Sequence, residues 1–115
     1  MSKYIQIDIR LLPAYGSGGL KGAFPNIFEL LSRSGYNLVL AEEPSLYEMV
    51  EVMIRVKNDP HVRSDSKKPI VLKLDELIKV RDLASKSLLA RRLDELDHLL
   101  YRLEDLFGDL DGNLV

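Results

Sequence analysis

Leucines recur through the C-terminal third of the chain at the spacing of a helix that packs against other helices. The recurring positions are Leu89, Leu93, Leu96, Leu100, Leu103 and Phe107. Steps of four and three residues alternate along this series, which is a heptad pattern almost three repeats long. Leu99 widens the apolar stripe, as in a helix with two neighbours. The pattern predicts a long helix over residues 75–107, with a kink near residues 85–87, where Ser-Lys-Ser interrupts the stripe.

A second helix is predicted directly before Asp59-Pro60, and it is almost entirely apolar. Ser45 and Glu48 form a capping box at its start, and the proline ends it. Its polar positions form one narrow stripe at helical spacing: Glu48, Glu51, Arg55 and Asn58. A helix with so little polar surface must be covered on more than one side. We therefore expect residues 45–58 to form the central helix of the core.

Three short apolar segments predict strands. Residues 4–11 alternate apolar and polar side chains, which is typical of a half-buried strand. Residues 36–41 and 69–74 are short apolar runs, which favour strands that are covered on both faces. Between the first two strands, Asn26 caps a predicted helix that Gly35 ends.

These elements predict an α/β or α+β fold. A small three-stranded sheet in β-α-β-α-β order would carry a long C-terminal helix or helical pair. With 115 residues, the chain has the length of one structural domain. We expect residues 1–74 to form a small α/β head, residues 75–107 the long helix and residues 108–115 a flexible tail.

The composition excludes several classes of site. Because the chain has no cysteine, it has no disulfide, no thiolate zinc site and no cysteine nucleophile. No apolar run reaches the roughly 18 residues of a membrane span, and the N-terminus lacks the apolar stretch of a signal peptide. We therefore expect a cytoplasmic protein without a bound cofactor.

Two segments superficially resemble metal sites. Glu95 and His98 have the spacing of half a di-iron motif, but they point away from the leucine seam, and the further carboxylates are missing. Residues 109–112 resemble part of a calcium loop, whose first ligand position would fall on Phe107. The sequence therefore predicts no metal site.

A glycine-rich segment at residues 16–22 lies between the first predicted strand and helix, where a phosphate-binding loop would lie. A P-loop needs a lysine and a hydroxyl directly after its last glycine, whereas Lys21 precedes Gly22. The dinucleotide fingerprint also fails, because it requires glycine at the position of Lys21. A flexible connector is the simpler interpretation, with Lys21 as the residue that would contact an anion.

Charge is distributed unevenly along the chain. Residues 59–92 hold a surplus of basic side chains and residues 93–115 a surplus of acidic ones, within a net charge of −2. The basic segment suggests phosphate contacts through Arg63, Lys67, Lys68, Arg91 and Arg92. The pI of about 5.7 and the lack of aromatic residues over 61–92 are atypical of nucleic-acid-binding domains. Solvated helix faces are the simpler explanation.

Three functions remain open. The first is a non-enzymatic interaction or assembly module that self-associates, preferably as a homodimer, or docks on a protein partner through the leucine seam. A helix of this length exceeds what a small head covers, and exposed apolar patches mark interfaces. The second is an accessory nucleic-acid-binding subunit that uses the 61–92 surface. The third is a small nucleotide- or phosphate-binding enzyme that uses the glycine segment. The residues favour the first.

Overall fold

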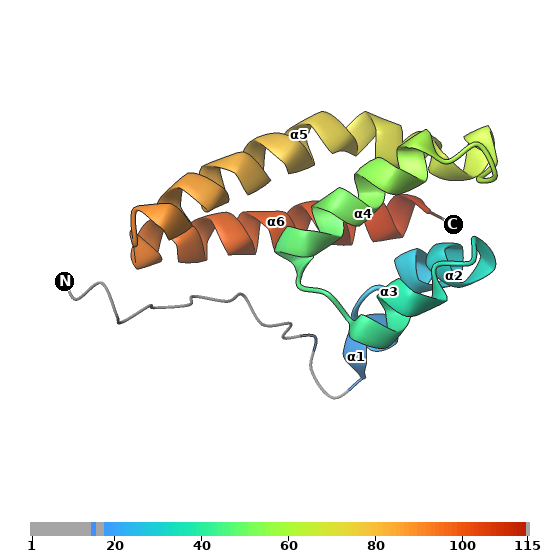
Figure 1. The fold of residues 1–115 in the computed structure, drawn as a ribbon, viewed down its shortest axis with the longest axis horizontal. Helices are drawn as coiled ribbons and strands as arrows, with labels where there is room; N and C mark the ends of the chain where they lie inside the picture. Colours follow the sequence, from blue (N-terminus) through green and yellow to red (C-terminus); the bar gives the residue numbers. More distant parts are fainter. Residues whose placement is uncertain (1–14, 16–17, 115) are drawn as a thin grey trace, which may run out of the picture.

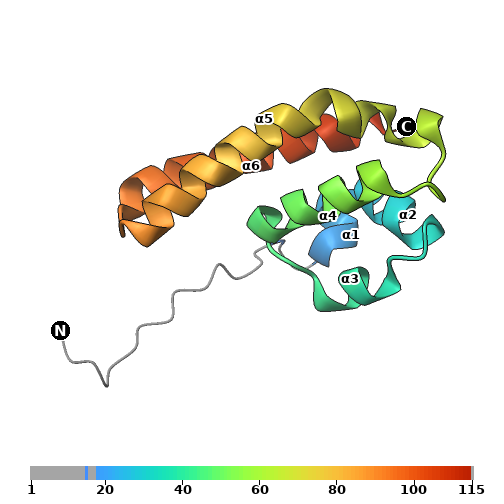
Figure 2. The ribbon, with the colours of Figure 1, turned by 45° about the horizontal axis from the view of Figure 1, so that its top comes forward.

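The fold is all-helical over the residues that the computed structural model describes, which are Tyr15 and residues 18–114. Its elements are α1 (Gly19–Ala23), α2 (Pro25–Arg33), α3 (Asn37–Glu42), α4 (Leu46–Asn58), α5 (Ser64–Leu89) and α6 (Leu93–Asn113). The long helices α5 and α6 run antiparallel and form a hairpin, and α1 to α4 lie against one part of its length (Figures 1 and 2). None of the described helices combines the length and the apolar character needed to cross a membrane.

The expected α/β fold with a three-stranded sheet is wrong. Residues 36–41 fall almost entirely in α3, and residues 69–74 lie inside α5. The strand expected over residues 4–11 lies outside the described residues. A short apolar run fits a buried strand and a buried helix equally well. In α5, Ile70 and Leu74 are buried while Leu72 is exposed, which is the four-residue spacing of one helix face.

The C-terminal half forms the helical pair that we gave as the alternative to one long helix, but its bounds differ from the expected 75–107. α5 begins eleven residues earlier, at Ser64, and the chain reverses at residues 90–92. Arg91 has a left-handed φ of 58°, which lets the chain turn between the two helices. Residues 85–87, where we expected a kink, are helical, and residues 108–113, expected as part of a tail, extend α6.

The prediction of a central helix at 45–58 is confirmed. The Ser45 Oγ accepts the N–H of Glu48 at 3.3 Å and so caps α4. The five fully or nearly buried side chains of α4 are Met49, Val50, Val52, Met53 and Val56. α4 packs against both α5 and α6, which accounts for its narrow polar stripe.

The start of α2 is capped from the other end of the chain, and the expected cap by Asn26 is wrong. The helix begins at Pro25, and the preceding Phe24 offers no side-chain acceptor. The Oδ1 of Asp111, in α6, accepts the N–H of Ile27 at 2.8 Å instead. The Asn26 amide donates to the Asp111 carbonyl, also at 2.8 Å. The expected stop at Gly35 is confirmed, since Gly35 has a φ of 84° directly after the helix.

Opposite charges face each other across the hairpin. Lys73 of α5 lies 3.7 Å from Asp109 of α6, and Arg102 of α6 lies 2.5 Å from Glu76 of α5. The basic and acidic surpluses of consecutive segments therefore compensate in part within the hairpin. Exposed pairs of this kind each contribute about 0–1 kcal/mol to stability.

Candidate functional site

The glycine-rich segment binds a carboxylate of its own chain. Gly19 has a φ of 63° and begins α1, and the N–H of Leu20 donates to Oε2 of Glu43 at 2.7 Å. Glu43 itself has a left-handed φ of 44°. Lys21, the expected anion contact, is exposed, and its ammonium lies 5.7 Å from the ring centre of Phe28. The acceptor for the Leu20 N–H is thus supplied from the α3–α4 loop.

We expect Gly19→Ala to lower the free energy of unfolding by about 1–2 kcal/mol. A Cβ at position 19 would lie 2.6 Å from Oε2 of Glu43, so the carboxylate must move off the Leu20 N–H, and the positive φ adds strain. Gly22→Ala is the matched control, because a Cβ there meets nothing within 4 Å. It should leave stability unchanged or raise it by up to about 1 kcal/mol. Urea unfolding of both variants checks this, and equal midpoints would contradict it.

The basic residues suggested for nucleic-acid contact do not form one patch. Arg63, Lys67 and Lys68 lie at the start of α5, whereas Arg91 and Arg92 follow its end. Lys67 is therefore about 33 Å along the helix axis from Leu89, the last residue of α5 before this turn. The Lys67 ammonium also donates to the carbonyls of Lys57 and Asp59 at 3.0 and 2.9 Å, where it closes the end of α4.

On one side of α6, the burial of the leucine seam falls toward the hairpin tip, which we define as residues 88–95. Phe107, Leu100 and Leu93 follow one another at seven-residue steps and so share one side of α6. Phe107 is fully buried, Leu100 is half-buried and Leu93 is 59% exposed. Leu96 and Leu103 are buried. The seam residues therefore divide into an inner part that packs within the chain and an outer part near the tip.

Side-chain burial also decreases toward the tip along the side of α5 that extends beyond α4. Ile78 is half-buried, Ser85 lies two turns further along the same face and is half-buried, and Leu89 is 81% exposed. α4 overlies only part of the hairpin, and its first residues lie near the middle of the hairpin's length (Figure 1). Ile78 packs against the core, whereas the described residues leave Leu89 largely uncovered.

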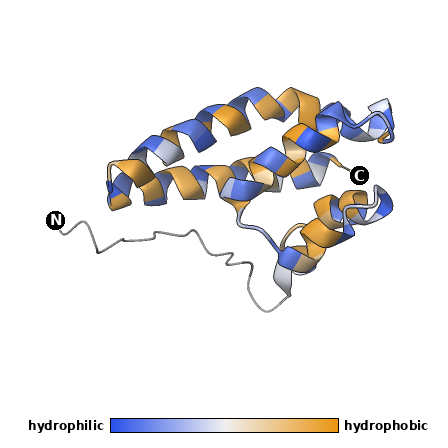
Figure 3. Cartoon of the chain, in the orientation of Figure 1, coloured by the Kyte–Doolittle hydropathy of each residue, from blue (hydrophilic) through white to orange (hydrophobic). Residues whose placement is uncertain are grey.

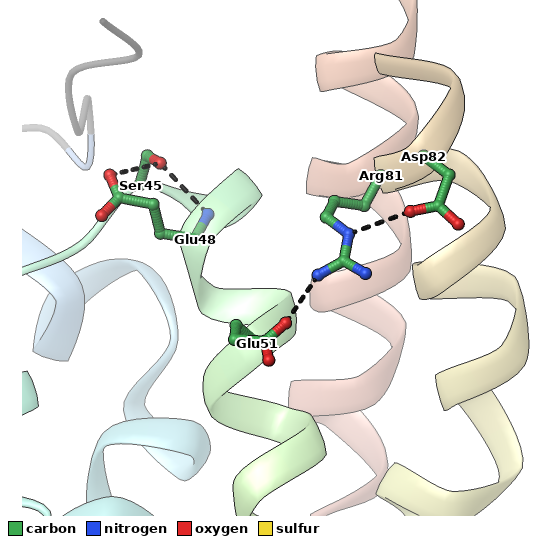
Figure 4. A network of polar contacts seen from close by, with 5 residues as sticks. All are labelled: Ser45, Glu48, Glu51, Arg81 and Asp82. Atoms are coloured by element: carbon green, nitrogen blue, oxygen red, sulfur yellow. Dashed lines mark hydrogen bonds and ion pairs between the residues drawn. The ribbon is translucent and has the colours of Figure 1, made fainter. Parts of the chain in front are cut away.

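A groove of about 550 Å³ lies where α4 begins, between α3, α4 and α5. Four carboxylates line it, from Glu42, Glu48, Glu51 and Asp82. Val39, Tyr47 and Val52 add apolar surface, and Ser85 lies at its α5 wall. Figure 4 shows three of these carboxylates, on Glu48, Glu51 and Asp82, together with Arg81. Glu48 is hydrogen-bonded to Ser45 at the start of α4, and Glu51 is directed at Arg81.

Arg81 is held in place by two of these carboxylates. Its Nη1 lies 2.9 Å from Oε2 of Glu51, and its Nε lies 3.3 Å from Oδ1 of Asp82 (Figure 4). Partial burial works to lower the pKa of Arg81, but the hydrogen bonds to Glu51 and Asp82 outweigh it, so the pKa is raised. One fixed guanidinium against four carboxylates leaves the groove with an excess of negative charge.

Tyr15 fixes the loop beside the groove. Its hydroxyl donates to the carbonyl of Pro44, a groove-lining residue, and its ring packs edge-on to Phe24. Burial raises the pKa of the Tyr15 phenol, and the nearby carboxylates of Glu43 and Glu48 raise it further. Tyr15 is therefore a neutral hydrogen-bond donor that anchors the α3–α4 loop.

Tyr15 and residues 18–114 contain no cluster of metal-ligating side chains. No three His, Asp or Glu side chains of this region gather closely enough to hold a metal ion. His98 is exposed on α6. The groove was not anticipated from the sequence, because its walls come from three separate helices. The sequence indicated only that Glu48 and Glu51 belong to the polar stripe of α4.

Comparisons of the chain with protein-family models, with curated proteins and with solved structures find no match. The hairpin tip and the groove are the features of the described residues that bear on function.

Proposed function

We propose that the protein is a non-enzymatic assembly module that self-associates through the tip of its α5–α6 hairpin. The observation that carries the proposal is the pair of exposed leucines at the tip, Leu89 and Leu93. They lie on either side of the 90–92 turn, at the outer end of the seam. Apolar residues continue along both helices of the hairpin toward this end (Figure 3).

Burial of these leucines supplies the driving force. Covering one exposed leucine is worth about 1.5–3 kcal/mol, and two copies would bury four of them. A stable dimer usually buries about 800 Å² on each partner, which this small tip reaches only together with its surroundings. We therefore expect a weak dimer, with a Kd in roughly the micromolar range.

A second copy is the partner that the charges favour. Two arginines, Arg91 and Arg92, precede Leu93, and two carboxylates, Asp94 and Glu95, follow it. A surface that holds both signs beside an apolar centre can pair with itself across a two-fold axis. Self-association of identical copies is therefore sufficient for the proposed function, without a different partner protein.

Leu89→Ser combined with Leu93→Ser should abolish self-association without unfolding the protein. Exposed positions tolerate such changes to within about 0.5 kcal/mol, so the helical circular dichroism signal should not change. Light scattering coupled to size-exclusion chromatography, over a range of concentrations, gives the mass. Leu72→Ser is the matched control, because Leu72 is 78% exposed on the same helix and about 25 Å further along it. A wild-type mass that stays monomeric up to several hundred micromolar would contradict the proposal.

A further inference from the structure

The uncovered side of α5 runs from the groove directly to the hairpin tip. Asp82 and Ser85 line the groove, and Leu89 follows Ser85 by one turn on the same side of the helix. Arg91 and Arg92 come next, in the turn that ends the hairpin. The acidic wall at Asp82, the small Ser85 and the exposed Leu89 thus succeed one another along about 10 Å of the helix, and the basic turn follows directly.

We infer that the groove receives the turn Arg91-Arg92 of a second copy, in a two-fold dimer whose α5 helices lie antiparallel. This inference rests on the proposed self-association and adds its receptor and its orientation. A two-fold axis that is perpendicular to α5 and passes beside its exposed side, midway between Ser85 and Leu89, reverses the order of features in the second copy. The basic turn of each copy then lies opposite the acidic wall of the other, and the contact is made twice.

The sizes of Leu89 and Ser85 also fit this arrangement. With the axis between them, Leu89 of one copy lies over Ser85 of the other, so that a large side chain meets a small one. Each Leu89 is then covered by the α5 helix of the second copy. In this dimer, the α5 helix of the second copy packs on the part of α5 that lies between the start of α4 and the hairpin tip.

Charge complementarity selects the basic turn as the occupant of the groove. Arg81 already holds Glu51 and Asp82 within its own chain, and Glu42 and Glu48 add negative charge on the opposite walls. Arg91 forms no ion pair with a described residue, and Arg92 has only an exposed contact with Glu95, 3.7 Å away. Both guanidinium groups are exposed and able to reach a second molecule.

Two charge-reversal variants test the orientation. The turn variant carries Arg91→Glu and Arg92→Glu, and the groove variant carries Glu42→Lys and Asp82→Lys. Glu42 and Asp82 are exposed, and a lysine at the end of α3 suits the helix dipole, so both variants should fold. Circular dichroism and thermal unfolding verify this before association is measured.

Each variant alone should dimerise at least about tenfold more weakly than the wild type at low salt, because like charges meet twice. An equimolar mixture of the two should form a heterodimer, since the glutamates of one turn then meet the lysines of the other groove. Sedimentation equilibrium, with one variant carrying a fluorescent label, measures this directly. The wild-type Kd should also rise between about 50 and 500 mM NaCl.

The outcomes separate this inference from the proposed function. If the wild type dimerises and loses this with Leu89→Ser and Leu93→Ser, but the mixture of charge variants stays monomeric, the orientation is overturned and the assembly function stands. The orientation is also overturned if each charge variant dimerises as tightly as the wild type. A monomeric wild type overturns both.

Discussion

Phe107→Ala is expected to lower the free energy of unfolding by about 3–5 kcal/mol, the largest effect of any single substitution considered for this chain. Phe107 is fully buried in α6, and its ring lies edge-on to Phe24, 6.3 Å between centroids. Removing the ring leaves a cavity where α6 meets the segment between α1 and α2. Because a small domain has about 5–15 kcal/mol of stability in total, the variant should be marginally folded at 37 °C.

Urea unfolding followed by circular dichroism measures this loss. Tyr101→Ala is the matched control, since Tyr101 is an aromatic residue of the same helix that is 61% exposed. It should change stability by less than about 0.5 kcal/mol. Phe107→Leu, which retains most of the volume, should cost less than Phe107→Ala. A Phe107→Ala variant as stable as Tyr101→Ala would show that this part of the core is packed differently.

Asp111→Ala is expected to destabilise the protein by about 1–3 kcal/mol. The Asp111 side chain is buried, and its Oδ1 is the acceptor for the N–H of Ile27 at the start of α2. Alanine would leave that N–H buried without a partner and would remove a negative charge from a helix N-terminus, where it is favourable. Chemical unfolding gives the free energy, and hydrogen exchange at the Ile27 amide should accelerate by more than exchange in α5.

Asp111→Asn separates the hydrogen bond from the charge. The asparagine carbonyl can still accept from Ile27, so this variant should lose less stability than Asp111→Ala. Asp109→Ala is a second control, because Asp109 lies two residues earlier in α6 but is exposed and holds only the surface pair with Lys73. It should cost no more than about 1 kcal/mol. If Asp109→Ala and Asp111→Ala had equal effects, Asp111 could not be the cap of α2.

Elements whose pattern extends over several turns were predictable from the sequence. α4 could be placed to within a residue, because Ser45 and Pro60 mark its ends and its apolar positions leave a single polar stripe. The apolar seam from Leu96 to Phe107 also predicted a helix correctly. In both segments the period repeats often enough to exclude a strand.

The six-residue apolar runs at 36–41 and 69–74 were too short to distinguish a helix from a strand. Each holds fewer than two helical turns, and their short apolar character favoured a strand. In 69–74 the decisive information lay outside the run, in the buried residues Leu77 and Val80 that continue the period of Ile70 and Leu74. Tertiary packing on α4 and α6 then determined the local structure.

The polar contacts that join distant segments also could not be predicted from the sequence. Asp111 could be assessed only as part of a failed calcium loop, and Glu43 carried no signal at all. One local indication existed for Asp111, because Phe24 precedes Pro25 at a position where a helix normally has a polar cap. An uncapped helix start predicts an acceptor elsewhere, but the sequence does not say where.

The cap that Asp111 supplies to α2 also determines when this helix can be completed during protein synthesis. The acceptor lies 84 residues after the donor, so the ribosome must release almost the whole described chain before Ile27 gains its partner. At about 5–20 residues per second this delay lasts several seconds. During that interval the Ile27 N–H in the first turn of α2 lacks its side-chain acceptor.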